Sequence, residues 1–229
     1  MFQGVSGYNT LSIHAHLRRL FRWSVGRGII ASNPMADMPR PAAAPKRERV
    51  LSDAELVAVW RASEQLGWPF GSAIQLLILT GARREEIGQL QWSEIDGNEI
   101  KLSGARTKNG EPHNIPLSQW ALAIIEAGKR IGPFVFSFNG TKHIRAWSHA
   151  KTHLDELVEI APWRIHDLRR TTATFLQKLK TPLQVTEAIL GHTAGSRAGV
   201  IGIYQRHDYA DEKRAALEAW GAHVMALVQ

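Results

Sequence analysis

Apolar residues recur at helical spacing over most of the chain. Three such stripes are formed by Leu56, Val59 and Trp60, by Leu168, Thr172, Phe175, Leu176 and Leu179, and by Leu217, Trp220, Val224 and Leu227. Residues 73–80 are apolar nearly all round, which indicates a buried helix. The pattern therefore predicts a mainly α-helical chain in which one helix is surrounded by others.

A shorter period occupies residues 93–118. Ile95, then Ile100 and Leu102, then Ile115 and Leu117 suggest short strands. Asn109-Gly110 lies between the last two runs and is a strong signal for a tight hairpin. We therefore expect a small antiparallel β-sheet, and the fold class is mainly α with this sheet, α+β.

Capping signals mark several helix ends. Ser52-Asp53-Ala54-Glu55 has the form of a capping box and begins one helix, whereas Gly81 and Leu190-Gly191 end two others. Residues 118–158 are expected to be helical with a break at Gly132-Pro133. A last amphipathic helix is expected over residues 211–229.

The chain divides into three stretches by composition. Residues 1–37 hold one amphipathic helix from Leu11 to about Gly26, and one helix cannot bury its own apolar face. We therefore expect this stretch to be the end of a domain whose front is missing. Residues 38–50 form a basic linker rich in Pro and Ala, and residues 51–229 form the second unit.

Charge narrows the class of partner. The chain has 229 residues, 28 Lys plus Arg against 21 Asp plus Glu, a net charge of +7 and a pI near 10.0. This balance favours nucleic acid first and an acidic membrane second. The chain contains no Cys, so disulfides, thiol nucleophiles and Cys-ligated zinc are excluded. No apolar run is long enough to span a bilayer, and a cytoplasmic setting fits.

Basic side chains gather on the later part of the expected helix 118–158. They are Lys142, Arg145, His149 and Lys151, together with His143 and His153. This helix face is suited to phosphates, and Arg170 is a further candidate for DNA contact. The alternative is an ordinary solvated helix face.

Candidate chemistry centres on residues 163–171. His166 and Arg169 are three apart, roughly 60° around a helix at about 100° per residue, so they share a face. The other candidates lie at well-defined positions: Arg83 after a buried helix and a Gly turn, with Glu86 one turn on; Lys108 at the hairpin tip; His192 after a capped helix end; and Tyr204 after a Gly-rich run.

This set suits a phosphodiester without a metal. It lacks convergent carboxylates, which hard cations prefer. Two guanidiniums can neutralise phosphate oxygens, Lys108 can protonate a leaving 5′-oxygen, and a His can relay the proton of Tyr204 as the phenol attacks.

These segments resemble the active-site boxes of the tyrosine recombinase (phage integrase) family, in the family's order over residues 51–229. The segments are Thr80-Gly81-Ala82-Arg83 with Glu86, Thr107-Lys108-Asn109-Gly110, His166-Asp167-Leu168-Arg169-Arg170-Thr171, Leu190-Gly191-His192 and Tyr204. Residues 1–37 resemble the last helix of that family's core-binding (SAM-like) domain.

The resemblance implies a catalytic-domain fold and a set of roles. Arg83 and Arg169 clamp the scissile phosphate, Glu86 supports them, Lys108 is the general acid, and His166 and His192 assist. Tyr204 forms a 3′-phosphotyrosine, which needs no cofactor and no metal.

The resemblance also implies the setting. The partner is double-stranded attachment-site DNA, bound by a homotetramer that often passes its C-terminal helix, here 211–229, to a neighbour. The expected role is integration or excision of a phage or genomic island in the bacterial cytoplasm, at the nucleoid.

Alternatives remain at two levels. Tyr209 competes with Tyr204 as the nucleophile, although Asp208 beside it would raise its pKa. The rival functions are a DNA-binding module without catalysis, a type IB topoisomerase and, last, a His-based metallohydrolase.

Overall fold

The computed structural model describes residues 7–42, 47–192 and 207–229 of the chain. It separates into two compact units, Met1–Glu48 and Arg49–Gln229. In the first unit, α1 spans Gly7–Gly26, so the predicted N-terminal helix is confirmed. Its apolar face is largely uncovered, because Ile13, Leu20 and Trp23 are each about half exposed. Beside it, Arg18, Arg22 and Arg40 line a hollow of about 540 Å³.

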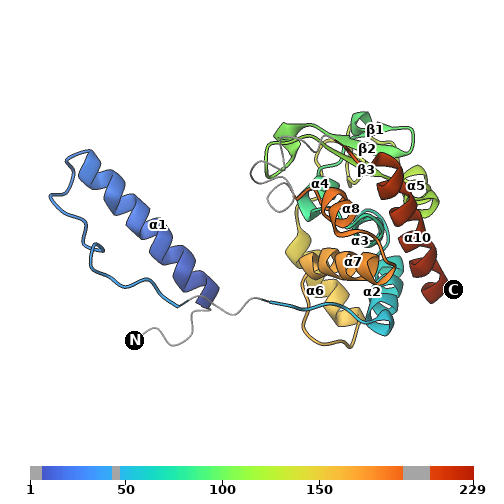
Figure 1. Cartoon of the computed structure of the whole chain (residues 1–229), viewed down its shortest axis with the longest axis horizontal. Helices are drawn as coiled ribbons and strands as arrows, with labels where there is room; N and C mark the ends of the chain where they lie inside the picture. Colours follow the sequence, from blue (N-terminus) through green and yellow to red (C-terminus); the bar gives the residue numbers. More distant parts are fainter. Residues whose placement is uncertain (1–6, 43–46, 193–206) are drawn as a thin grey trace. The chain divides into compact units, whose positions relative to one another are not determined.

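The second unit combines helices with one small sheet (Figure 1). Its helices are α2 (Asp53–Leu66), α3 (Phe70–Thr80), α4 (Arg84–Gly88), α5 (Gln119–Glu126), α6 (Trp147–Leu157), α7 (Ile165–Lys178), α8 (Leu183–Ile189) and α10 (Ala210–Val228), with 3₁₀ turns η1 (Trp92–Glu94) and η2 (Gly104–Arg106). The strands are β1 (Ile95–Asp96), β2 (Glu99–Leu102) and β3 (His113–Pro116). This mostly helical composition confirms the predicted fold class.

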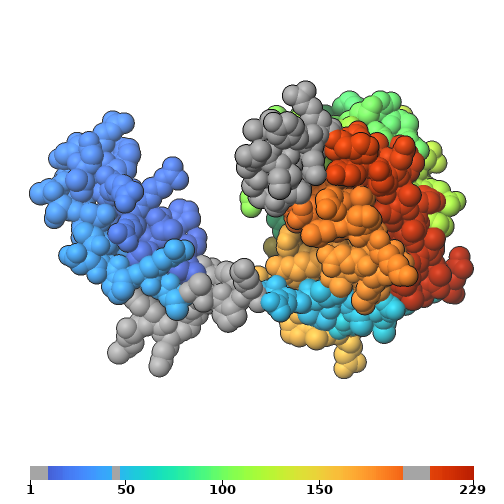
Figure 2. Space-filling view, viewed as in Figure 1, coloured from blue at the N-terminus to red at the C-terminus, as the bar shows by residue number. Residues whose placement is uncertain are grey.

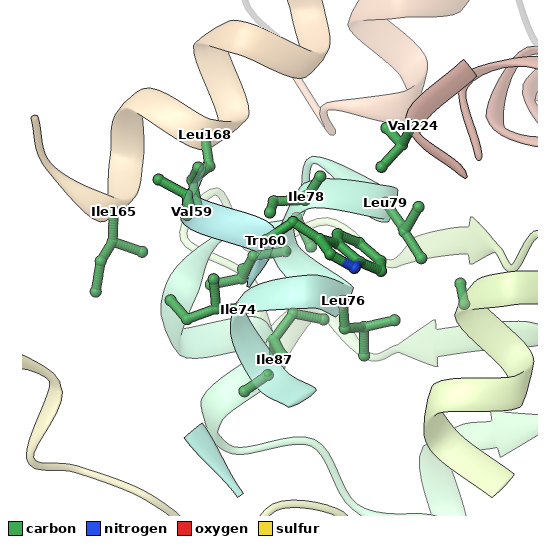
Figure 3. Close-up of a cluster of buried hydrophobic side chains, with 14 of the residues drawn as sticks. Val59, Trp60, Ile74, Leu76, Ile78, Leu79, Ile87, Ile165, Leu168 and Val224 are labelled. Carbon is green, nitrogen blue, oxygen red and sulfur yellow. The ribbon is translucent and has the colours of Figure 1, made fainter. Parts of the chain in front are cut away.

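Helix α3 is the centre of the core. It packs against α2, α4, α5, α7 and α10, as its nearly uniform apolarity requires. Figure 3 shows Ile74, Leu76, Ile78 and Leu79 surrounded by side chains from α2, α4, α7 and α10. Gly81 ends α3 in the left-handed conformation at φ 63°, which a glycine adopts without strain. The chain therefore turns sharply just before Arg83.

The sheet is antiparallel with the order β1-β2-β3. Ile100 pairs with Ile115 and both are buried, so the predicted strands are confirmed. The predicted tight turn at Asn109-Gly110 is wrong, because the connection runs over residues 103–112 and contains η2. This loop closes on itself, since Thr107 Oγ1 lies 2.7 Å from the carbonyl oxygen of Glu111 and 3.1 Å from that of Gly104.

Two predictions about the helices are corrected, one on extent and one on burial. Residues 118–158 are not continuous helix around one break, because α5 ends at Glu126 and α6 begins only at Trp147. Asn139 Oδ1 accepts hydrogen bonds from the backbone N–H groups of Thr141 and Lys142, which favours a turn there. Leu179, which was expected in the apolar stripe of its helix, is 38% exposed, because it lies at the end of α7 where the core stops.

Helix α10 lies along one side of its own unit, beside α7 and α8 (Figure 2). Trp220 and Val224 are fully buried, and Trp220 Nε1 donates to the carbonyl of Ile78 in α3 at 2.7 Å. The predicted amphipathic helix therefore packs on the core of its own domain. Among the described residues, no helix is both long enough and apolar enough to cross a bilayer.

Candidate active site

Arg83 is fixed by the first turn of α4. Its backbone N–H donates to Glu86 Oε2 at 2.9 Å, and its Nη1 donates to Glu86 Oε1 at 2.7 Å. Glu86 is 2% exposed, so the carboxylate is held against the core and cannot rotate away. This pair, three residues apart on one turn, fixes the direction of the Arg83 guanidinium.

Arg169 reaches the same place from the second turn of α7. It is 5% exposed, and its Nη1 donates to the carbonyl of Gly81 at 2.8 Å. Burial, and then the nearby charge of Arg83, lower its pKa to about 10, so Arg169 stays protonated at neutral pH. A buried guanidinium with backbone partners is preorganised for an anion.

Two consecutive carbonyls join these arginines. Leu190 O accepts from Arg169 Nη2, and Gly191 O accepts from Arg83 Nη2 at 3.2 Å. Gly191 has φ 58°, and this left-handed residue ends α8 and aims the carbonyls at the two guanidiniums. The predicted glycine cap is confirmed, and it brings three distant segments of the chain together.

His192 and His166 flank the arginines. His192 Nε2 lies 3.1 Å from Arg169 Nη2. Burial, followed by the charges of Arg169 and Arg83, lowers the pKa of His192, and burial with the charges of Arg169 and Arg170 lowers that of His166. Because arginine has no acceptor, His192 Nε2 must be the acceptor, which requires a neutral ring.

Lys108 lies on the wall of a cleft of about 760 Å³, exposed on the loop between β2 and β3. This cleft, here named the basic cleft, is lined by the basic residues Arg83, Arg84, Arg106, Lys108, Lys151 and Arg164, and also by His166. Asn109 Nδ2, next to Lys108, donates to Gly191 O at 3.4 Å. The loop thus meets the same carbonyl that holds Arg83.

Five predicted site residues therefore come together from α4, the β2–β3 loop, α7 and the end of α8. Tyr204 lies outside the described residues. Its competitor Tyr209 caps α10 at φ 53°, is partly buried, and its ring centroid lies 4.8 Å from that of His207.

The predicted DNA-contacting residues do not form one helix face. Lys142 and Arg145 precede α6, because the Asn139 turn replaces the expected helix there. His149 is exposed on α6, whereas Lys151 pairs with Asp155 at 2.5 Å and lies over the ring of Trp163. Arg170 donates to Asp167 at 2.9 Å.

Two polar residues near the site were not predicted. Arg106 precedes Lys108 by two positions and pairs with Glu94, a contact between segments that no local spacing indicates. His113 is 7% exposed and lies against Gly191. In the sequence, its burial was indicated only by its place on the inward face of β3. Burial lowers the pKa of His113 to about 4.

Comparison with known proteins fits this geometry. A model described as "Phage integrase family" matches residues 49–210. Prophage integrase IntF of Escherichia coli strain K12 is 30% identical over 212 residues, which are 82% of this chain and 44% of IntF. The chain thus spans less than half the length of IntF.

Solved structures share the fold. A lambda integrase dimer bound to a COC′ core site has a TM-score of 0.65 at 20% identity, covering 82% of this chain and 73% of that one. A lambda integrase tetramer bound to a Holliday junction has a TM-score of 0.66 at 18% identity, covering 84% and 61%. Since the family model spans most of the second unit and more than half of the whole sequence, the chain belongs to the phage integrase family.

Proposed function

We propose that the chain is a site-specific DNA recombinase that cuts and rejoins DNA through a 3′-phosphotyrosine, integrating or excising a phage or genomic island. The observation that carries this proposal is the pair of guanidiniums, Arg83 and Arg169, held by the adjacent carbonyls of Gly191 and Leu190. Two fixed cations beside two histidines and a lysine-bearing loop suit a phosphate that gains charge in its transition state.

The proposed cleavage step forms one bond to phosphorus and breaks another, and it needs no cofactor. The phenol oxygen of Tyr204 bonds to phosphorus while the bond from phosphorus to the 5′-oxygen breaks. The phenol proton passes to His166 or to water, and Lys108 gives a proton to the leaving 5′-oxygen. The new phosphodiester conserves the bond energy, so the 5′-hydroxyl of another strand can reverse the step.

The arginines supply the electrostatic part of the mechanism. Arg83 and Arg169 neutralise the two non-bridging oxygens, and Glu86 keeps Arg83 pointed at them. His192 donates to a non-bridging oxygen from Nδ1, because its Nε2 already accepts from Arg169. These groups are fixed before DNA arrives, so little reorganisation is needed during the reaction.

The proposed partner is double-stranded DNA at attachment sites, bound through Lys142, Arg145, His149, Lys151 and Arg170 around the basic cleft. The net charge of +7 supports a polyanionic partner, and the lambda integrase structures contain DNA. We further propose a homotetramer on DNA and action in the bacterial cytoplasm at the nucleoid, by analogy with the lambda tetramer on a Holliday junction.

The proposed domains are a core-binding (SAM-like) remnant at 1–37, a linker at 38–50 and the catalytic domain at 51–229. The exposed apolar residues Ile13, Leu20 and Trp23 support the first assignment, because a single helix with that face needs further partners. The arginine-lined hollow beside α1 suits a phosphate backbone.

Exchange of helix 211–229 between subunits is a separate proposal. The neighbouring domain would have to bury Trp220 as its own domain now does. Gln119 Nε2 and Glu218 Oε1 lie 2.7 Å apart between α5 and α10, and the chain has no natural Cys. In a Gln119→Cys/Glu218→Cys chain, a short bismaleimide should link subunits on DNA if α10 is exchanged. Links within one chain alone would contradict exchange.

The decisive test of the function is covalent capture. The chain is incubated in EDTA with a nicked attachment site from the borders of the encoding element, and the products are separated on a denaturing gel. We expect a protein–DNA band that disappears in Tyr204→Phe and persists in Tyr209→Phe. A band that persists in Tyr204→Phe would contradict the assignment of the nucleophile.

The rival functions give other outcomes. A DNA-binding module would retain the DNA without any covalent band. A type IB topoisomerase would relax supercoiled plasmids that lack the attachment site. A metallohydrolase would hydrolyse the DNA without any covalent band, and EDTA would stop that cleavage.

A further inference from the structure

Arg106 connects the loop that carries Lys108 to the turn before β1. Its Nε donates to Glu94 Oε1 at 2.7 Å, and its Nη2 donates to Glu94 Oε2 at 3.2 Å. This fork-to-fork pair is 17% and 12% exposed at its two side chains. A bidentate pair that is mostly shielded from water is stronger and more directional than a surface ion pair.

Glu94 is itself fixed to the backbone. Its Oε2 accepts from the N–H of Gln91 at 2.9 Å, at the start of η1. The N–H of Trp92 donates to the carbonyl of Pro133, which holds this turn against the neighbouring segment. Glu94 is therefore a rigid anchor for the loop.

The remaining donors of Arg106 contact the segment that positions Arg83. Nη2 donates to the carbonyl of Glu86 and Nη1 donates to Gln89 Oε1, each at 3.3 Å. Glu86 is also the residue whose carboxylate holds Arg83. One guanidinium thus ties the Lys108 loop to the turn that aims Arg83.

Lys108 follows Arg106 by two positions. The intervening Thr107 is extended, with φ −104° and ψ 151°, and both basic residues line the basic cleft. A lysine has a long flexible stem, and a general acid must come within about 3 Å of the atom that it protonates. Fixing the backbone at Arg106 restricts the point from which this stem extends, and so limits the space that the amine can reach.

We propose that Arg106 is a positioning residue, which with Glu94 holds Lys108 where it can protonate the leaving 5′-oxygen. This inference rests on the proposed function, because it assumes the general-acid role of Lys108. It predicts a defect in leaving-group protonation rather than in phosphate binding.

The test replaces the leaving oxygen by sulfur. A nicked attachment site with a 5′-bridging phosphorothiolate releases a thiolate, which leaves without a proton donor because thiols are far stronger acids than alcohols. Cleavage of this DNA therefore does not need Lys108. Single-turnover rates are measured on the oxygen and sulfur substrates for each variant.

On the oxygen substrate we expect Lys108→Ala to slow cleavage by about 100-fold or more. Arg106→Ala and Glu94→Gln should slow it by about 100-fold, the scale of a catalytic group misplaced by about 1 Å. On the sulfur substrate all three should approach the wild-type rate. Arg83→Ala should stay slow on both substrates, because sulfur does not replace a phosphate clamp.

A matched control is the pair between Arg214 of α10 and Glu99 of β2, whose Nη2 and Oε1 atoms lie 2.8 Å apart. Arg214→Ala removes an ion pair to strand β2 and should leave both rates near wild type. If Arg106→Ala does not fold by circular dichroism, Arg106→Lys tests the same point, since lysine cannot form the bidentate pair.

The outcomes separate the two proposals. Rescue of Lys108→Ala by sulfur without rescue of the Arg106 and Glu94 variants would overturn the inference and leave the proposed function intact. Wild-type rates for the Arg106 and Glu94 variants on the oxygen substrate would do the same. Absence of a covalent product from the wild-type chain on both substrates would overturn the proposed function, and the inference with it.

Discussion

Arg169 Nη2 lies 3.1 Å from Nε2 of His192, which joins the second turn of α7 to the residue after the glycine cap of α8. Arginine can only donate, so the histidine accepts through Nε2 and carries its proton on Nδ1. The ring is thereby neutral, and its remaining N–H is available to an incoming phosphate. Burial, and then the charge of Arg169, lower the pKa of His192 and so disfavour a second proton on the ring.

The pKa of His192 should respond to Arg169. Burial comes first and the charge of Arg169 second among the causes that lower it, so Arg169→Gln should raise it towards the ordinary value of about 6.5. Histidine NMR titration checks this, with the urea-unfolded chain as the reference. A pKa at or above the unfolded value in the folded wild type would contradict the arrangement.

Removing the side chain of Arg83 should lower the free energy of unfolding far more than removing that of its neighbour Arg84. Arg83→Ala leaves the carboxylate of Glu86 buried and without its ion pair, which costs about 3–5 kcal/mol. Arg84 and Glu85 form an adjacent pair at 49% and 51% exposure, so Arg84→Ala should cost less than about 1 kcal/mol. Urea unfolding measures the free energy that each variant loses. Equal losses would show that the buried ion pair stabilises the fold no more than the exposed one.

Gly191→Ala should disturb the carbonyls that hold the arginines. A Cβ there would lie 3.0 Å from His113 Nδ1, in addition to the strain of φ 58°. We expect a loss of about 1–3 kcal/mol of unfolding free energy. Gly97 is a matched control, because its φ is 57° and no described atom lies within 4 Å of a Cβ built there.

The steric part of this loss can be separated from the backbone strain. Gly97→Ala should show the strain alone, about 1 kcal/mol. Gly191→Ala should cost less in a His113→Ala chain than in the wild type, because the clash is then gone. Thermal unfolding of the wild type, the three single variants and the Gly191→Ala/His113→Ala chain measures these terms, and an unchanged cost of Gly191→Ala would exclude a clash with His113.

His113 should make the fold sensitive to mild acid. Burial lowers its pKa to about 4, so between about pH 6.5 and 4 the unfolded chain binds a proton that the folded chain does not. Stability therefore falls as the pH falls through this window, by about 2 kcal/mol between pH 7.5 and 5. The lowered pKa values of His166 and His192 act in the same direction.

A His113→Leu chain isolates this contribution. Between pH 7.5 and 5 its free energy of unfolding should fall by about 2 kcal/mol less than that of the wild type, whatever its stability at pH 7.5. Urea unfolding at the two pH values gives the comparison. Equal pH dependence in the two chains would show that His113 is not the titrating group.

The order of residues along the chain determined those helix ends and strands that depend on neighbouring residues. Ser52 and Glu55 form the predicted capping box, Gly81 and Gly191 take left-handed conformations at helix ends, and Ile100 and Ile115 pair across the predicted sheet. These features depend on neighbours within a few residues, so they are readable from order alone. The extent of α6 was missed because the side chain of Asn139 competes with helix formation.

All six expected catalytic residues were proposed from the sequence, whereas the meeting of the five that the structure describes was decided by the tertiary structure. Arg83 and Arg169 come together because α3 and α7 pack on each other and the end of α8 offers two carbonyls between them. The partner of Arg106 and the burial of His113 are likewise contacts across the fold. Sequence order fixes periodicity and capping, whereas distant partners depend on how the core packs, and no local spacing encodes that.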